Sequence, residues 1–123
     1  MILLYTAGPY RSAEGPWGVQ KNINAAMLVA HKLWGMGYAV ICPHGNTAHF
    51  DGPGYDDSDM WLEGDMEMIR RCDGIVMLPG WEDSEGAKQE LAEAERCGKR
   101  VYYWPADGPA RWVRRRRRVG EGS

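Results

Sequence analysis

The sequence predicts an α/β fold in which helices cover both faces of a parallel sheet of four to five strands. Short apolar runs alternate along the chain with segments of helical periodicity, which is the pattern of parallel strands joined by right-handed crossovers. The 123 residues are enough for one domain with its own core and too few for a separate substrate domain. We therefore expect a small doubly wound domain, flavodoxin-like or Rossmann-like, over residues 1–110, with a flexible basic tail over residues 111–123.

Four short apolar runs, rich in β-branched and aromatic residues, are the expected strands. They cover residues 2–6, 38–42, 74–78 and 100–104. An open parallel sheet binds ligands beyond the carboxyl ends of its strands. The segments that follow the first three strands, residues 7–22, 43–57 and 79–86, are therefore the expected binding loops.

Three segments have the spacing of amphipathic helices. The first has an apolar face from Ile23 to Trp34, and the second and third cover residues 59–72 and 86–98. Asp65 and Glu90 fall on the inward stripes of the second and third helices. A carboxylate on an apolar face must be paired, desolvated or used. For Glu90 alone a buried salt bridge is an equally good interpretation, but two inward carboxylates on two helices indicate a site.

The first loop begins with Gly8, Pro9, Tyr10 and Arg11, directly after the first strand. Gly8 lets the backbone approach a ligand closely, and the forked guanidinium of Arg11 suits a phosphate. A plain turn with a surface arginine would explain the same residues. Neither a P-loop nor a dinucleotide-binding glycine pattern occurs in the chain.

The third loop leads into the helix that carries Glu90. Ser84 and the free N–H groups near Gly86 form an expected anion site, and Ser84 is also a candidate N-cap, so both roles can coexist. Trp81 can stack on a base or plug the core. The loop histidine His44 is expected to contact a substrate.

The composition excludes several other classes. The spacing of His44, His49 and Asp51 matches no standard zinc pattern, so no metal site is predicted. Three widely spaced cysteines favour a reducing cytoplasm, and the short apolar N-terminus is expected to be a strand rather than a signal or a membrane span. The run of arginines at residues 114–118 has no interleaved aromatic residues, so a nucleic-acid partner is disfavoured.

Three motifs together resemble the nucleoside 2-deoxyribosyltransferase superfamily over roughly residues 1–104. They are Gly8-Pro9-Tyr10-Arg11, Asp65 eight residues before Asp73, and Ser84-x-Gly86-x-x-x-Glu90. The resemblance implies that Glu90 is the nucleophile that attacks the anomeric carbon. It also implies that Asp65 acts in acid/base chemistry on the base or orients it, and that the Tyr10 hydroxyl helps to position the nucleophile.

One departure from that family concerns the 5′ end of the substrate. Members that accept free nucleosides commonly have an Asp six residues before the nucleophile, where this chain has Ser84. The nucleoside 5′-monophosphate N-glycosidases are similar to this chain in having Ser there and Arg in the first loop. A hydroxyl, a helix N-terminus and a guanidinium suit a phosphate that an Asp would repel, although Asp83 lies next door. Small relatives of this superfamily from phages and bacteria also look similar to this chain.

The expected function is cleavage of the N-glycosidic bond of a nucleoside 5′-monophosphate, with a deoxyribonucleotide favoured and no cofactor needed. The alternatives are base exchange by a deoxyribosyltransferase and a nucleotide-binding module without turnover. Six Trp and six Tyr are more aromatic surface than so small a core hides, and Trp34, Trp61 and Trp112 lie where they could flank a neighbour. We therefore expect a homodimer or larger homo-oligomer, as the resemblance also implies.

Overall fold

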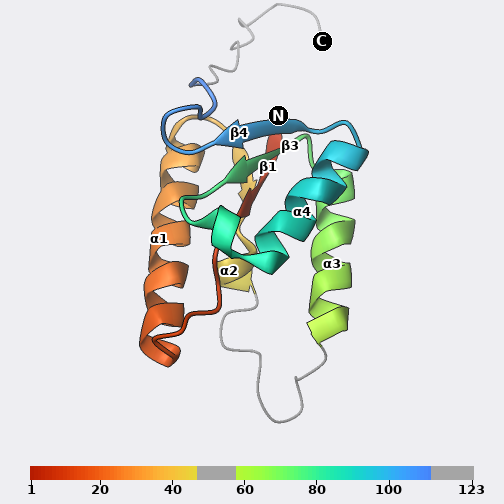
Figure 1. Ribbon diagram of the computed structural model, residues 1–123. Coiled ribbons are helices and arrows are strands. Elements are labelled where there is room, and N and C mark those ends of the chain that lie inside the picture. Colours follow the sequence, from red (N-terminus) through yellow and green to blue (C-terminus); the bar gives the residue numbers. More distant parts are fainter. Residues whose placement is uncertain (47–57, 112–123) are drawn as a thin grey trace, which may run out of the picture.

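Four parallel strands form one sheet, in the order β2-β1-β3-β4 (Figure 1). The computed structural model describes residues 1–46 and 58–111 of the chain. The strands are β1 (Leu3–Ala7), β2 (Ala39–Ile41), β3 (Gly74–Met77) and β4 (Arg100–Tyr103). This order is the flavodoxin-like topology, so the predicted fold class is confirmed.

Helices cover both faces of the sheet. They are α1 (Pro16–Gly35), α2 (Pro43–Asn46), α3 (Ser58–Arg71) and α4 (Glu85–Arg96), with a short 3₁₀ helix, η1 (Trp81–Asp83). Figure 1 shows α1 on one face and α3 with α4 on the other. Within the described ranges no helix is long and apolar enough to cross a membrane.

The central strand β1 is buried on both faces, which explains its continuous apolar sequence. Leu4 packs in the cluster that contains Leu33 of α1. Tyr5 and Ala7 point the opposite way, into the cluster that α3 and α4 cover. The alternation therefore places the Tyr5 side chain beneath the two helices that carry Asp65 and Glu90.

Two loops differ from the sequence prediction. Helix α1 begins at Pro16 rather than after Asn22, because proline already has the backbone angle of a first helical turn. The loop after β1 therefore covers only residues 8–15, and the Asn22 side chain donates to the Tyr10 carbonyl at 3.0 Å. The loop after β2 begins with the short helix α2. The rest of that loop, with His49 and Asp51, and the tail after Arg111, with Trp112, lie outside the described residues.

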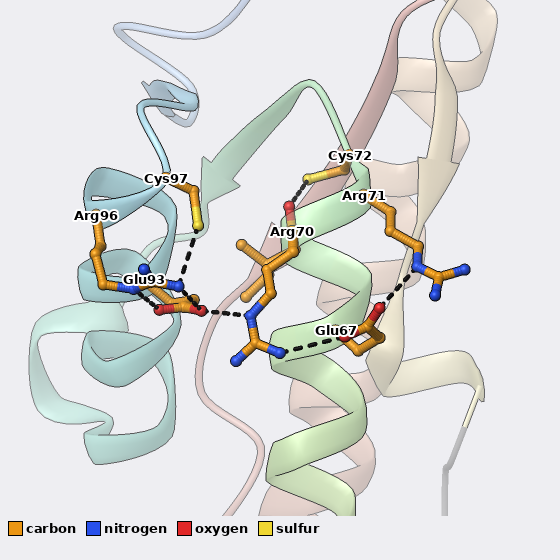
Figure 2. Close-up of polar contacts among 8 residues, drawn as sticks. Glu67, Arg70, Arg71, Cys72, Glu93, Arg96 and Cys97 are labelled. Carbon is orange, nitrogen blue, oxygen red and sulfur yellow. Dashed lines mark hydrogen bonds and ion pairs between the residues drawn. The ribbon is translucent and has the colours of Figure 1, made fainter.

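An ion-pair network joins α3 to α4. Arg70 Nε donates to Glu93 Oε2 at 2.7 Å, and Arg96 Nε donates to Glu93 Oε1 at 2.6 Å, so Glu93 lies between two guanidinium groups (Figure 2). Glu67 on α3 accepts from Arg71 at 2.8 Å and from Arg70 at 3.2 Å. Exposed pairs stabilise little individually, but this network fixes how the two helices lie against each other.

We expect E93Q to lower the melting temperature by a few degrees at pH 7 and to have less effect as the pH falls. Hydrogen bonds from Arg96 and Arg70 lower the pKa of Glu93 from 4.5 to about 2. A lowered folded-state pKa gives stability that is fully present above 4.5 and is lost as the pH falls through about 2. Thermal melts from pH 2 to 7 check this, with E95Q, at an exposed position of α4, as the control. An E93Q deficit that stays constant over this range would contradict the assignment.

Candidate functional site

A cavity of about 490 Å³ lies at the carboxyl edge of the sheet. It is lined by residues 8–11, 43–44, 62, 65, 83–87 and 89–90. These residues come from the loop after β1, from α2, from the N-terminal half of α3 and from the start of α4. The lining therefore contains most of the site residues that the sequence predicts, and its volume is that of a small-molecule site.

Glu90 lies on the buried face of α4, with 7% of its surface exposed, as its position on the helical stripe predicts. The Tyr5 hydroxyl donates a hydrogen bond to Glu90 Oε2. Tyr5 is fully buried in the middle of β1, where it pairs in register with Ile75 of β3. A strand in the centre of the sheet thus fixes the side chain that holds Glu90.

Burial dominates the electrostatics of both carboxylates. Removal from water raises the pKa of Glu90 from 4.5 to about 8; the Tyr5 hydrogen bond opposes this rise, and the negative charge of Asp65 adds to it. Burial raises the pKa of Asp65 from 3.8 to about 6, again opposed by a hydrogen bond with Tyr5. Between about pH 6 and pH 8 the pair therefore holds one proton, mainly on Glu90.

Tyr5 is the site residue that the sequence analysis missed. The resemblance implies that the Tyr10 hydroxyl helps to position the nucleophile, and this stays a prediction; the hydroxyl that donates to Glu90 Oε2 in the structure is that of Tyr5. The Tyr10 ring lines the cavity and meets His44 edge to face, with ring centroids 5.9 Å apart. A tyrosine in an otherwise apolar central strand needs a partner for its hydroxyl, and this signal could have identified Tyr5.

The start of α4 and the loop after β1 bring together groups that suit an anion. Ser84 caps α4 as predicted, because its Oγ accepts from the Ala87 amide at 3.2 Å, and its hydroxyl proton remains available to donate. Arg11 is exposed and makes no ion pair within the described residues. A Cβ added at Gly86 would meet nothing within 4 Å, so the first turn of α4 is open to the cavity.

Two further carboxylates line the same part of the cavity. The side chains of Asp83 and Glu85 flank Ser84 in the sequence, and both are exposed. Glu85 pairs with Lys88 at 2.9 Å, which partly neutralises it. The region near Ser84 therefore combines anion donors with one carboxylate, Asp83, that would repel a phosphate.

His44 holds the two loops at the cavity mouth together. Its Nε2 lies 2.9 Å from the Pro9 carbonyl, and its side chain is only 5% exposed. Burial lowers the pKa of His44, and backbone carbonyls at Pro9 and Gly8 only partly oppose that effect. The ring is therefore neutral near pH 7, with Nε2–H donating to Pro9.

Two predicted residues have a different environment from the one expected. A Cβ at Gly8 would lie 2.8 Å from Leu78 Cβ, so Gly8 is required for strand packing as well as lining the cavity. Trp81 is not part of the lining. Its ring packs against that of Tyr103, with centroids 5.8 Å apart, and against the core cluster under α4, which supports a plug rather than a base platform.

The residues described hold no cluster of three or more His, Cys, Asp or Glu that could bind a metal ion. The groups at the cavity that can take part in chemistry are the buried carboxyl of Glu90, the half-buried carboxyl of Asp65, the buried phenol of Tyr5 and the nearby anion donors.

We expect E90Q to be more stable than the wild type at pH 9, by a few kcal/mol, and to lose this advantage near pH 4. A carboxylic acid whose folded-state pKa is raised binds its proton more tightly in the folded state. Wild-type stability therefore falls as the pH rises from about 4.5 to about 8. Chemical denaturation at several pH values measures the difference, with the exposed Glu63 supplying the control E63Q. If E90Q is less stable than the wild type at every pH, the claim that Glu90 is buried and keeps its proton at neutral pH is wrong.

Several known structures have the same fold. The 2-desoxiribosyltransferase from Leishmania mexicana has a TM-score of 0.58 and 22% identity, covering 87% of this chain and 66% of its own. The 2-deoxyribosyltransferase from Bacillus psychrosaccharolyticus has a TM-score of 0.56 and 23% identity, covering 82% of this chain and 70% of its own. The CMP N-glycosidase BcmB from Clostridium botulinum has a TM-score of 0.55 and 16% identity, covering 82% of this chain and 69% of its own.

These likenesses show the fold that the sequence resemblance implied. The chain spans about two thirds of the length of these proteins. No curated protein matches the chain in sequence. The model of the family described as Domain of unknown function (DUF4406) matches residues 2–103, which is most of the chain, and the chain belongs to that family.

Proposed function

We propose that the protein cleaves the N-glycosidic bond of a nucleoside 5′-monophosphate, with a deoxyribonucleotide favoured, and releases the free base and the sugar 5-phosphate. The observation that carries this proposal is the arrangement of Glu90 and Asp65 around the Tyr5 hydroxyl at the inner wall of the cavity. A protein that only bound an anion would gain nothing from two carboxylates, one buried and one half-buried, in the wall of its cavity.

In the proposed reaction the ionised Glu90 attacks C1′ of the sugar. The bond between C1′ and the base nitrogen breaks, its electron pair goes to the base, and Asp65 gives the base a proton. The product is an ester between Glu90 and the sugar. Water then attacks C1′, its proton goes to Asp65, and Glu90 is released, as in a retaining glycosidase.

The proton on the pair must move before this reaction begins. In the empty site Glu90, with a pKa of about 8, holds the proton in preference to Asp65, with a pKa of about 6. The reactive state has the proton on Asp65 instead, and two pKa units correspond to about 3 kcal/mol. Tyr5, whose hydroxyl interacts with both carboxylates, offers a path for this transfer: the hydroxyl turns from Glu90 to Asp65 and gives Asp65 its proton while its oxygen takes the proton of Glu90. Positive charge developing at C1′ favours the ionised Glu90 in the transition state.

The groups near the start of α4 support a 5′-phosphate. Arg11, the Ser84 hydroxyl and the free amides around Gly86 are donors in the lining of the cavity, and the positive end of the α4 dipole adds to them. The CMP N-glycosidase among the similar structures acts on a nucleoside monophosphate by its name. This likeness supports the same substrate class here.

Asp83 favours the alternative substrate, a free nucleoside. A carboxylate on the cavity wall can accept a hydrogen bond from a 5′-hydroxyl, and two of the similar structures are 2-deoxyribosyltransferases by name. In that case a second base would compete with water for the ester, and the reaction would be base exchange. The two reactions share Glu90, Asp65 and Tyr5 and differ in the group bound near Ser84.

We expect E90Q to release base at least about a thousandfold more slowly than the wild type, because the amide cannot form the ester. Chromatography of free base from a panel of nucleotides measures the rate. Acid quench and peptide mass spectrometry should locate a sugar phosphate adduct on the peptide that contains Glu90. An adduct on the peptide with Asp65 would mean that Asp65 is the nucleophile and Glu90 the acid and base. Turnover by E90Q within a few-fold of the wild type would rule out Glu90 as the nucleophile.

We expect R11A to lower kcat/KM for monophosphates about ten- to a hundredfold and to leave nucleosides nearly unchanged, because a charge-assisted hydrogen bond is lost only with the phosphate. D83N removes the repulsion and should raise kcat/KM for monophosphates. If instead D83N weakens nucleoside turnover and R11A affects both substrates equally, the 5′-hydroxyl is the group bound.

G86A tests the same end of the cavity without disturbing the fold. The added methyl group points into open space, and alanine is favoured over glycine in a helix by about 0.5–1 kcal/mol. We expect G86A to melt no lower than the wild type while monophosphate turnover falls. Unchanged turnover would mean that no ligand group approaches the first turn of α4.

A further inference from the structure

Asn22 is a polar residue on the inward face of α1. It lies four residues after Gly18 and four before Ala26, which are both buried, and this spacing puts the three on one side of the helix. Asparagine is also a poorer helix former than alanine, because its side chain competes for backbone hydrogen bonds. A polar group that faces the interior must be paired. The partners of Asn22 therefore indicate what it contributes.

These partners are two carbonyl groups of the loop after β1. Asn22 Nδ2 donates to the Tyr10 carbonyl at 3.0 Å and to the Arg11 carbonyl at 3.4 Å. A carbonyl oxygen can only accept, so the amide nitrogen, with its two hydrogens, is the end of the side chain that faces the loop. Asn22 thus joins α1 to two consecutive residues that line the cavity.

The same stretch of loop is held at two further points. His44 Nε2 donates to the Pro9 carbonyl at 2.9 Å. Ser12 packs directly on α1, because a Cβ added at Gly18 would lie 1.9 Å from Ser12 Oγ and 2.4 Å from Ser12 Cβ. Arg11 belongs neither to β1 nor to α1, so no regular element fixes it. Contacts with α1 and α2 fix the backbone on both sides of it instead.

A fixed backbone matters for Arg11 because its side chain is long and exposed. Such a side chain loses conformational freedom when it binds an anion, and the loss is smaller where the backbone that carries it is already in place. The hydrogen bonds of Asn22 hold the peptide groups on either side of the Arg11 Cα atom. They therefore determine from which point the guanidinium reaches into the cavity.

We propose that Asn22 is a positioning residue, which holds the loop after β1 so that Arg11 reaches the phosphate of the substrate. The proposal rests on one part of the proposed function, the binding of a 5′-phosphate in the cavity, and does not depend on cleavage of the glycosidic bond. Asn22 is not part of the cavity lining, so it acts through the loop and not on the ligand.

Hydrogen–deuterium exchange of the full chain tests whether Asn22 holds the loop. We expect N22A to speed exchange at least about threefold in peptides from residues 8–15 and to leave α1 and the strands unchanged. N24A is the matched control, because Asn24 is an exposed asparagine of α1 that accepts from Gln20 of the same helix at 2.9 Å. Unchanged exchange in residues 8–15 of N22A would overturn the proposal. Faster exchange throughout α1 would also overturn it, because Asn22 would then support the helix.

Calorimetric titration with deoxynucleoside 5′-monophosphates tests the link to Arg11. The titrations use the E90Q background, in which the ligand stays intact. We expect N22A to raise Kd about two- to tenfold, the effect of one hydrogen bond, and N24A to leave Kd unchanged. In the R11A background N22A should change Kd by less than about twofold, because the side chain that it positions is gone. An equal effect of N22A with and without Arg11 would overturn the proposal.

The outcomes distinguish this proposal from the proposed function. A protein that binds monophosphates with this dependence on Asn22 and Arg11, but releases no base, would contradict the proposed reaction and leave the role of Asn22 intact. A protein that releases base from nucleosides and binds no monophosphate would overturn the role of Asn22. Cleavage of the glycosidic bond would then stand without it.

Discussion

The site depends on the interactions of the buried Tyr5 hydroxyl with two carboxylates, Glu90 and Asp65. Glu90 and Asp65 come from different helices, and only the packing of α3 and α4 over β1 brings both to one phenol. The cluster around Tyr5 excludes water, and this exclusion raises the pKa of each carboxylate. The Arg70 and Glu93 pair joins the same two helices farther from the cavity, so a surface contact helps to set the geometry of a buried one.

This arrangement lowers the stability of the folded state at neutral pH. A carboxylate with a raised pKa destabilises the folded state at the pH where the cell works, and an apolar side chain at position 90 would pack more favourably. Groups that are kept at such a cost concentrate at functional sites. The cluster between α1 and the sheet has no such destabilising carboxylate, because its buried residues are apolar side chains and Tyr38. Among the described residues Glu90 is the buried carboxylate, and it lies on the cavity side of the sheet.

The sequence predicted the fold class and the inward position of both carboxylates because hydrophobic periodicity reports which face of each element is buried. It missed Tyr5, since alternation in a strand buried on both faces does not distinguish a packing tyrosine from one whose hydroxyl enters a site. Trp81 was expected as a possible base platform, but the 3₁₀ turn of η1 directs its ring onto Tyr103. Gly8 was predicted to let the backbone approach a ligand, and it lines the cavity, but it also permits a close approach to Leu78 that the sequence did not indicate. These details depend on contacts between elements far apart in the chain, which local patterns do not encode.

The central claim is that Glu90 is buried and protonated in the empty site at neutral pH. Infrared difference spectroscopy of wild-type protein and E90Q, titrated from pH 5 to pH 10, measures this directly through the stretching band of a protonated carboxyl group. We expect a wild-type band that is present at pH 7 and disappears with a midpoint near pH 8, whereas E90Q should show no band at pH 7 and only that of Asp65 below about pH 6. A wild-type spectrum without a protonated carboxyl above pH 5 would contradict the account, because Glu90 would then be an ordinary ionised side chain.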